Sequence, residues 1–519
     1  MIKSNGGIIG PDNVTTGGAF GTASGVFKLN EVTNLIKESK WPGGGPQGFQ
    51  VANSARFNSG SSDFLNRTTE TPTNADKATF SFWVKRSKLG TNQSMLSERA
   101  DGNNLTDIYF NSDDKLEIHS YNSGTEYIFL RTVRLFRDVG AWMHIMYSFD
   151  TSQGTNTNRV KLYINGVQET SFSSGSGNVY PNENQNLRFN ESGHTLRIGN
   201  LNSDQYPDFY LSEVVFVDGT AQANTDLGEF DEDSGIWKPK NVSGLTFGTN
   251  GFYLDFENSG SLGADVSGNS NNFTVNNLTA IDQSTDTCTN NFATINSLDK
   301  WSGSTAATSS FLSNGNLDLD IGSSAKSLVR STIGVTSGKW YYEVKVNTKG
   351  KGFFGFCNTN AFDGSTSPHD ATDSRGIFYY DQVPDFRGNS GDGAITTGVA
   401  SISNGNILNF ALDMDNFAFY IGVGGTYMNS GNPTSGSNKT GAISELFTNG
   451  SQYLSNFGEV FACLYCSSTS GGVDSSINFG SPPYSESGGN SDGNGYGNFN
   501  QSVPSGYYSL NTKNLSEYG

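Results

Sequence analysis

The chain has 519 residues with 64 Gly and only 13 Pro, and its 50 Asp and Glu outnumber 32 Lys and Arg, for a formal net charge of −18. This charge disfavours binding to the phosphate backbone of a nucleic acid, and no run of 18 apolar residues is present to cross a membrane as a helix. The 36 Phe, 22 Tyr and 6 Trp are too many for a disordered chain. Because Gly, Ser, Thr and Asn favour turns over helices, the sequence predicts an all-β protein.

Residues 1–48 hold the one convincing helical pattern of the sequence. Asn30 is a suitable N-cap, and the apolar side chains after it fall at helical spacing before a Gly-rich stop. The apolar stripe is too short to be stable alone. Two interpretations stay open, a helix that caps the next domain and a docking segment for another chain. The side chains that would dock are Val32, Leu35, Ile36 and Trp41.

Residues 49–281 alternate apolar and polar positions as β-strands do. Around Phe82 every second residue is apolar, which predicts a strand with one buried face. The stretch 142–149 is apolar on both faces, which indicates a central strand. Asn165-Gly166 is the strongest short hairpin signal in the chain. Many short strands separated by Gly and Asn turns predict a sandwich or jelly roll.

Residues 282–310 are polar and rich in Thr, Asn and Ser, so we interpret them as a linker. A second alternating pattern covers 311–483 and predicts a second β-sandwich, with a hairpin turn near Asp415 and Asn416. Residues 484–519 form a tail rich in Gly, Ser and Asn that cannot build a core of its own. Its last part fits a short strand on the surface of the second sandwich.

A first resemblance is carried by the stretch 142–149, the hairpin 160–168 and the strand 196–199. Together they resemble the concanavalin-like, laminin-G-type jelly roll, which shows a Trp-His strand, an aliphatic strand that ends in Asn-Gly, and a late Ile-Gly strand. Here His144 lies two residues after the Trp, and Glu213 takes the acidic position of the family's final strand. The resemblance covers roughly residues 49–281 and implies a jelly roll whose edge loops bind ligands.

The second half carries a second resemblance. The stretches 338–344, 354–356 and 376–379 and the hairpin 412–416 resemble a SPRY domain in their order and spacing. This resemblance covers about 311–483. It implies a β-sandwich that binds partners through loops at one end.

The segment 24–42, the stretches 228–239 and 251–256, and the tail from 505 resemble segments of virion structural proteins of marine-type phages. The resemblance implies a location on an extracellular particle and docking to other virion proteins through residues 1–48. It also implies a symmetric homo-oligomer, with a cyclic trimer as one expected form. The expected role is a tail fibre or appendage that displays β-sandwich domains to host surface glycans or proteins. The alternatives are a capsid or tail decoration protein with purely structural contacts, and a glycan depolymerase.

No catalytic set stands out in the sequence. The carboxylate cluster 229–233 departs from the Glu-x-Asp-x-x-Glu pattern of concanavalin-like hydrolases, because Ser234 replaces the last Glu. The four His are scattered without metal-ligand spacing, and His144 is expected to be a hydrogen-bonded core residue. We therefore expect no enzymatic activity, no catalytic residue and no organic cofactor.

Calcium is the one candidate cofactor, because hard oxygen ligands are abundant and laminin-G-type domains often bind this ion. The loop 265–272 superficially resembles an EF-hand loop but lacks the Glu at its twelfth position, and an Asx-turn loop is the alternative. The candidate calcium ligands are Asp231, Asp233, Asp255 and Asp265.

Four Cys in so long a chain do not make a disulfide framework. Cys463 and Cys466 have CxxC spacing within an apolar run. A strand there would point the two thiols to opposite faces, so we expect packing or surface thiols and no zinc site.

Overall fold

The structure is a computed structural model that describes residues 48–302 (except 174, 176 and 233), 312–321, 327–362, 376–388, 394–447, 455, 457–466 and 472–519, and two short strands before them. The predicted docking residues Val32, Leu35, Ile36 and Trp41 lie outside the described residues. The chain divides into two compact units. The smaller is Met1–Gln50 with Thr225–Gly244, and the larger is Val51–Asn224 with Leu245–Gly519.

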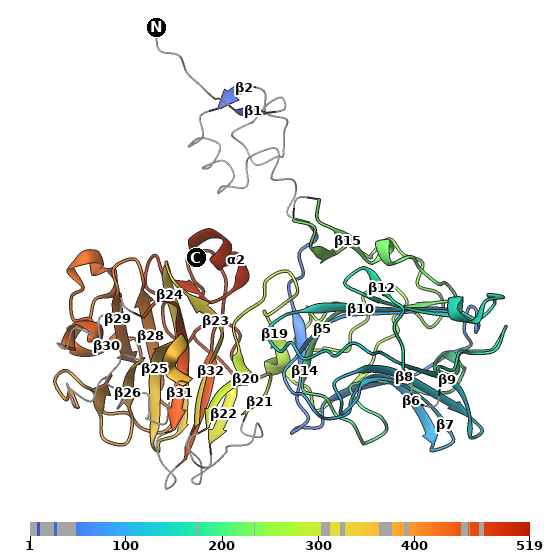
Figure 1. The fold of residues 1–519 in the computed structure, drawn as a ribbon, viewed down its shortest axis with the longest axis horizontal. Coiled ribbons are helices and arrows are strands. Elements are labelled where there is room, and N and C mark those ends of the chain that lie inside the picture. Colours follow the sequence, from blue (N-terminus) through green and yellow to red (C-terminus); the bar gives the residue numbers. More distant parts are fainter. Residues whose placement is uncertain are drawn as a thin grey trace. The chain divides into compact units, whose positions relative to one another are not determined.

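The first β-sandwich of the larger unit consists of two sheets (Figure 1). One sheet has eight strands in the order β12-β11-β10-β5-β14-β3-β19, with β17 also paired to β14. The other sheet has seven strands in the order β18-β4-β13-β6-β7-β8-β9. The eight-stranded sheet contains β3 (Ser54–Phe57), β5 (Lys77–Arg86), β10 (Met143–Asp150), β11 (Val160–Ile164), β12 (Val167–Glu169), β14 (Phe209–Asp218), β17 (Phe252–Leu254) and β19 (Gln283–Ser284). The seven-stranded sheet contains β4 (Phe64–Thr68), β6 (Gln93–Asp101), β7 (Asn104–Phe110), β8 (Leu116–Asn122), β9 (Thr125–Arg131), β13 (Thr195–Ile198) and β18 (Thr274–Asn276).

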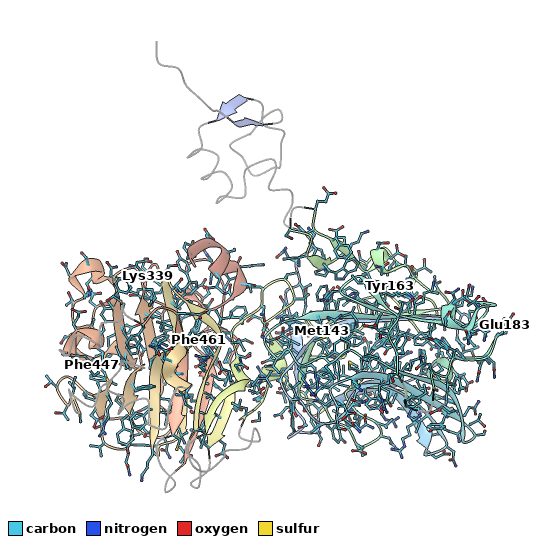
Figure 2. All side chains as sticks on the ribbon, in the orientation of Figure 1. Met143, Tyr163, Glu183, Lys339, Phe447 and Phe461 are labelled. Carbon is cyan, nitrogen blue, oxygen red and sulfur yellow. The ribbon has the colours of Figure 1, made fainter. Side chains whose placement is uncertain are left out.

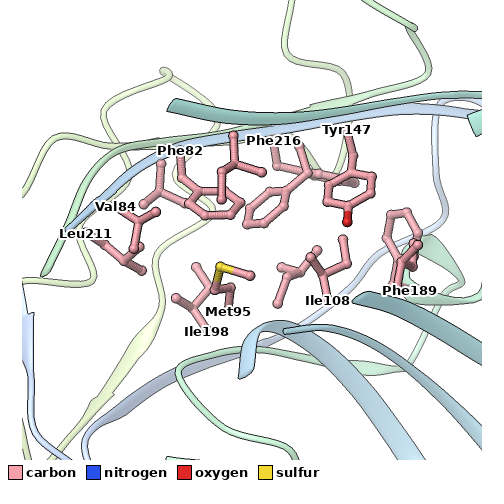
Figure 3. Close-up of a cluster of buried hydrophobic side chains, with 14 of the residues drawn as sticks. Phe82, Val84, Met95, Ile108, Tyr147, Phe189, Ile198, Leu211 and Phe216 are labelled. Atoms are coloured by element: carbon pink, nitrogen blue, oxygen red, sulfur yellow. The ribbon is translucent and has the colours of Figure 1, made fainter. Parts of the chain in front are cut away.

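The core of this sandwich lies between its two sheets. The alternating apolar residues of each strand point inward and interdigitate, and their burial is the main favourable term in folding. Figure 3 shows side chains from the eight-stranded sheet, from the seven-stranded sheet and from the short helix η2 (Arg188–Asn190) meeting in one cluster. The labelled members are Phe82, Val84, Tyr147, Leu211 and Phe216, then Met95, Ile108 and Ile198, and Phe189.

Strand β14 contains a β-bulge that the sequence pattern did not predict. The pairing with β5 shifts between Ser212 and Val215, and Glu213 within the bulge has a φ of 50°. Leu211 before the bulge and Val214 after it both belong to the core, so the inward positions slip by one residue. A bulge of this kind inserts one residue and re-aims its side chain.

The prediction that β5 has only one buried face is wrong. Thr79 and Lys85, on the face away from the core, are 0% and 1% exposed. Other parts of the chain cover this face, because the Thr79 hydroxyl donates to the Thr220 carbonyl at 2.9 Å and Lys85 Nζ contacts Asp286 at 2.7 Å. The polar side chains of Thr79 and Lys85 therefore make hydrogen bonds and an ion pair within the protein, where the sequence pattern had indicated contact with solvent.

The second β-sandwich pairs a six-stranded sheet, in the order β20-β23-β31-β25-β26-β27, and an eight-stranded sheet, in the order β21-β22-β32-β24-β28-β29-β30 with β33 also on β24. The six-stranded sheet contains β20 (Ile295–Ser302), β23 (Ser327–Val335), β25 (Gly352–Asn358), β26 (Gly376–Tyr380), β27 (Asp385–Arg387) and β31 (Val460–Cys466). The other sheet contains β21 (Leu312–Ser313), β22 (Asp318–Ile321), β24 (Lys339–Thr348), β28 (Ile407–Asp413), β29 (Ala418–Val423), β30 (Thr426–Tyr427), β32 (Val473–Asn478) and β33 (Tyr508–Ser509).

The remaining elements are short. The smaller unit contains the pairs β1 (Ile8–Gly10) with β2 (Gly25–Phe27) and β15 (Gly228–Phe230) with β16 (Trp237–Pro239). Among the residues that the structure describes, the other helices are η1 (Asn156–Asn158), η3 (Asn224–Asp226), η4 (Ala280–Asp282), η6 (Thr359–Phe362), η7 (Met428–Ser430), η8 (Pro433–Asn438), η9 (Ile443–Leu446) and α2 (Thr512–Tyr518). Within the described ranges, no helix is both long and apolar enough to pass through a bilayer. Because strands build both sandwiches and the helices are short, the all-β prediction is confirmed.

Residues 282–310 do not act as a free linker where they are described. Strand β19 pairs with β3 of the first sandwich, and β20 pairs with β23 of the second. The composition is polar, but backbone pairing needs no apolar side chain, so the prediction of a linker is wrong for this part.

The C-terminal residues 484–519 are folded onto the second sandwich. The buried Glu343 carboxylate accepts hydrogen bonds from the backbone nitrogens of Asn500 at 2.9 Å and Gln501 at 2.8 Å. Strand β33 then pairs in parallel with β24, in line with the predicted short strand. A segment without a core of its own is thus anchored by polar contacts to its neighbour.

Candidate functional site

The calcium candidate Asp231 lies beside the β15–β16 hairpin of the smaller unit. Its carboxylate accepts hydrogen bonds from Lys238 Nζ at 2.8 Å and the Ser234 nitrogen at 2.9 Å. These contacts, the lysine first, hold the pKa of Asp231 well below its usual range. Asp233 lies outside the described residues. The carboxylate of Asp231 already has a cation as its partner, the ammonium group of Lys238.

The calcium candidate Asp265 organises its own loop. Its Oδ1 accepts from the backbone nitrogens of Tyr253 and Ser267, both at 2.9 Å, and its Oδ2 accepts from the Asn271 nitrogen at 2.8 Å. These are the contacts of an Asx-turn loop. The fourth candidate, Asp255, accepts from the Glu257 nitrogen at 3.1 Å. Among the described residues no group of three His, Cys, Asp or Glu is placed to hold a metal ion, and calcium binding stays a prediction.

The carboxylates considered for a hydrolase lie on the same hairpin as Asp231. Glu229 Oε1 is 3.9 Å from Lys238 Nζ, and its side chain is 47% exposed. Retaining and inverting glycosidases instead place two carboxyl groups on either side of a bound sugar. The hairpin therefore presents a cation-paired acidic cluster.

Two ionisable groups noted in the sequence, Glu213 and His144, are buried on the eight-stranded sheet of the first sandwich, at the face that other parts of the chain cover. Burial raises the pKa of the Glu213 carboxyl to about 8, and Tyr253 OH donates to it at 2.6 Å. Burial lowers the pKa of His144 to about 3, and its Nε2 lies 2.7 Å from the Ser81 hydroxyl. Both groups are polar parts of the interior, as expected for His144.

The outer face of the seven-stranded sheet carries a row of side chains from β8 and β9 that contact one another. We call this row, formed by Tyr121, His119, Phe129 and Arg131, the aromatic stripe. The His119 ring lies 4.5 Å from the Tyr121 ring and 4.7 Å from the Phe129 ring, measured between centroids. The Arg131 guanidinium carbon lies 5.2 Å from the Phe129 centroid. Strand pairing creates the row because His119 and Phe129 are directly opposite each other in the antiparallel register.

Carboxylates hold His119 and Arg131 of the aromatic stripe in place. Glu126 Oε1 lies 2.6 Å from His119 Nε2, and the buried Glu117 accepts hydrogen bonds from Arg131 Nε and from Tyr109 OH. The side chains of His119, Glu126 and Arg131 are 23%, 25% and 29% exposed. The polar members of the stripe are therefore partly accessible, whereas Phe129 is buried, and the row is fixed before any ligand binds, which lowers the entropic cost of binding.

The chemistry of the aromatic stripe suits a polar ligand with apolar faces. Aromatic rings bind the C–H faces of sugars and the side chains of proteins, and a guanidinium and a carboxylate bind hydroxyl or amide groups. The sequence did not single out this site, because Tyr and Asn occur throughout the chain. The only signal was the alternation of Glu117, His119 and Tyr121 with the inward-pointing residues between them.

Comparisons with known proteins agree with the fold of the first sandwich. Residues 59–224 match the model of the laminin-G type within the concanavalin A-like lectin/glucanases superfamily. The first sandwich thus has a concanavalin-like fold. No curated protein matches the chain.

Three solved structures are similar to parts of the chain. The SPRY domain of human HERC1 is 19% identical, with 31% of this chain and 87% of that chain covered and a TM-score of 0.24. A native heptameric SAP-like pentraxin from Limulus polyphemus is 15% identical, with coverage of 34% and 82% and a TM-score of 0.26. Domain 4 of an extracellular arabinanase from Geobacillus stearothermophilus, in complex with arabinotriose, is 19% identical, with coverage of 29% and 65% and a TM-score of 0.21.

Proposed function

We propose that this chain is a virion appendage protein, such as a tail fibre, whose first sandwich binds glycans or proteins of the host surface through the aromatic stripe. The observation that carries the proposal is the fixed row of contacting rings and charges on the outer face of the seven-stranded sheet, in which His119 and Arg131 are partly exposed. The concanavalin-like fold of residues 59–224 supports a binding role, because this fold generally serves carbohydrate or protein binding. The place on a virion rests on the resemblance of the segments 24–42, 228–239 and 251–256 and of the tail from 505 to phage virion proteins.

Purified chain is expected to block adsorption of the virus to its host, and Tyr121→Ala is expected to weaken this competition about tenfold or more. Tyr121 lies at the end of the aromatic stripe, so its removal takes away ring surface without removing core residues. The measurement is the concentration of protein that halves adsorption. Each variant is first checked for an unchanged melting temperature.

The matched control is Tyr163→Ala on β11, a partly buried tyrosine of the opposite sheet that Figure 2 labels. This variant should compete as the parent chain does. Equal competition by Tyr121→Ala and Tyr163→Ala would remove the aromatic stripe from the binding site. Failure of the parent chain to compete at any concentration would favour a decoration protein with structural contacts only.

A further inference from the structure

A pocket of about 270 Å³ lies within the larger unit where loops of the two sandwiches meet. The first sandwich contributes side chains from the segments before β3 and around β19, and the second contributes residues that follow β32. The lining residues that matter for binding are Asn53, Gln283, Tyr484, Ser485, Glu486 and Asn498. This volume is at the small end of ligand sites and fits one ring-sized polar molecule.

The walls of this junction pocket are held together by direct contacts. Ser284 Oγ lies 2.7 Å from Ser481 Oγ, and the Thr285 hydroxyl donates to a backbone carbonyl of the other sandwich, that of Gly480, at 3.2 Å. Behind the wall, the fully buried Arg56 donates through Nη2 to the carbonyl of Ile281 at 2.8 Å and that of Pro482 at 3.4 Å. The pocket is therefore formed before a ligand arrives.

Glu486 brings a negative charge to the wall of the pocket. Glu486 Oε1 accepts from the backbone nitrogens of Ser487 at 2.6 Å and Gly488 at 2.8 Å and from Asn500 Nδ2 at 2.7 Å. Its Oε2 is buried and has no hydrogen-bond partner among the described residues. A buried acceptor of this kind costs free energy unless a donor reaches it.

The other polar groups of the pocket offer mixed donors and acceptors. The Gln283 amide is oriented by its Nε2, which donates to the carbonyls of Phe256 at 2.7 Å and Glu257 at 2.9 Å. Asn498 makes no side-chain hydrogen bond within the described part of the chain, so its amide is available. The Tyr484 ring is held by Lys345 Nζ, 4.8 Å from its centroid. The hydroxyl groups of a ligand both donate and accept hydrogen bonds, so a ligand rich in hydroxyls suits a pocket lined by a carboxylate, amides and an aromatic ring.

We propose that the junction pocket binds one neutral hexopyranose unit, free or as the end of a glycan. Its hydroxyls would donate to Gln283 Oε1 and exchange hydrogen bonds with the amide of Asn498, beside the Glu486 carboxylate, and its ring would lie against Tyr484. A hexuronate is disfavoured because its carboxylate would face that of Glu486. This site is separate from the aromatic stripe, so the inference goes beyond the proposed function and does not rest on it.

The test is a titration of the full chain with glucose, galactose, N-acetylglucosamine and glucuronate, followed by ligand-observed NMR and by the melting temperature. We expect at least one neutral sugar to bind and to raise the melting temperature, because a ligand that binds only the folded state stabilises it. Glucuronate should bind about tenfold more weakly than that sugar. Asn498→Ala should weaken binding about tenfold through loss of one buried hydrogen bond.

Two further variants make the result specific to the pocket. Ser485→Trp fills the entrance from an exposed position and should abolish binding. Asn182→Ala is the control for Asn498→Ala, because it makes the same substitution at an exposed site of the first sandwich, and it should leave binding unchanged. The proposal is overturned if none of the neutral sugars binds up to its solubility limit, or if binding survives Ser485→Trp. Loss of sugar binding in Tyr121→Ala would also overturn it, because the sugar would then lie on the aromatic stripe.

Discussion

Replacing Asp286 with alanine is expected to lower the free energy of unfolding by about 3 to 5 kcal/mol, because it leaves the buried cation of Lys85 without its partner. The two side chains are 2% and 1% exposed, and Nζ lies 2.7 Å from Oδ2. The second carboxylate oxygen, Oδ1, accepts from Trp142 Nε1 at 2.9 Å and from the Phe292 nitrogen at 3.2 Å. The substitution therefore removes an ion pair and the acceptor of two further donors.

The position of this ion pair explains why its loss should affect the whole larger unit. Lys85 Nζ also donates to Asn291 Oδ1 at 2.8 Å and to the Phe292 carbonyl at 2.9 Å. These residues lie between β19 of the first sandwich and β20 of the second. The lysine thus fixes the passage of the chain from one sandwich to the other, and we expect unfolding of Asp286→Ala to begin there.

Urea denaturation of matched variants measures the effect. Glu445→Ala breaks a surface pair, in which Lys439 Nζ lies 3.0 Å from Glu445 Oε1 and the side chains are 29% and 49% exposed, and should cost less than about 1 kcal/mol. The double variant Lys85→Met with Asp286→Ala should recover part of the loss, because no unpaired charge stays buried. Similar costs for Asp286→Ala and Glu445→Ala would show that the ion pair does not hold the junction.

Local signals predicted the strands and hairpins of this fold well. Asn165 and Gly166 have φ angles of 47° and 76°, the left-handed values that a two-residue hairpin turn needs, and Asn and Gly adopt them most easily. The alternation of Trp340, Tyr342 and Val344 places all three in the second core. Cys463 and Cys466 point to different clusters, as a strand with CxxC spacing requires. Each of these features depends on neighbours within a few residues.

Features that depend on distant parts of the chain were not predictable from the pattern. The polar outer positions of β5 indicated a solvated face, yet residues about 140 to 200 positions later in the chain cover Thr79 and Lys85. The aromatic stripe depends on the register that sets His119 opposite Phe129. The junction pocket needs loops that are more than 200 residues apart in sequence, as Gln283 and Asn498 are. No window of sequence contains both sides of such contacts.

Raising the pH from 7 to 9 is expected to lower the free energy of unfolding by about 2 kcal/mol. Burial raises the pKa of Glu213 to about 8 and that of Glu343 to about 7, whereas a Glu in the unfolded chain titrates near about 4.3. The folded state therefore keeps protons that the unfolded state has released. This stabilisation is complete below the unfolded pKa and is lost as the pH rises through the folded pKa.

The interval from pH 7 to 9 isolates these carboxyls from the buried histidine. The pKa of His144 is lowered to about 3 by burial, so its effect makes stability rise with pH only up to about 6.5, where the unfolded histidine loses its proton. Above pH 7 this contribution is constant. Of these two carboxyls, Glu213 contributes the larger share of the expected decrease, because its pKa lies inside the interval.

Glu213→Gln tests this assignment while it keeps an oxygen for the hydroxyl of Tyr253, which donates to Glu213 at 2.6 Å. The loss between pH 7 and 9, measured by urea denaturation at each pH, should shrink by the share of Glu213, about 1.4 kcal/mol. Glu183→Gln changes a carboxyl that is 55% exposed and should keep the parent profile. A Glu213→Gln profile as steep as that of the parent would place the titrating group elsewhere. A profile less steep by the share of Glu213 would show that the bulge of β14 holds a protonated carboxyl at neutral pH.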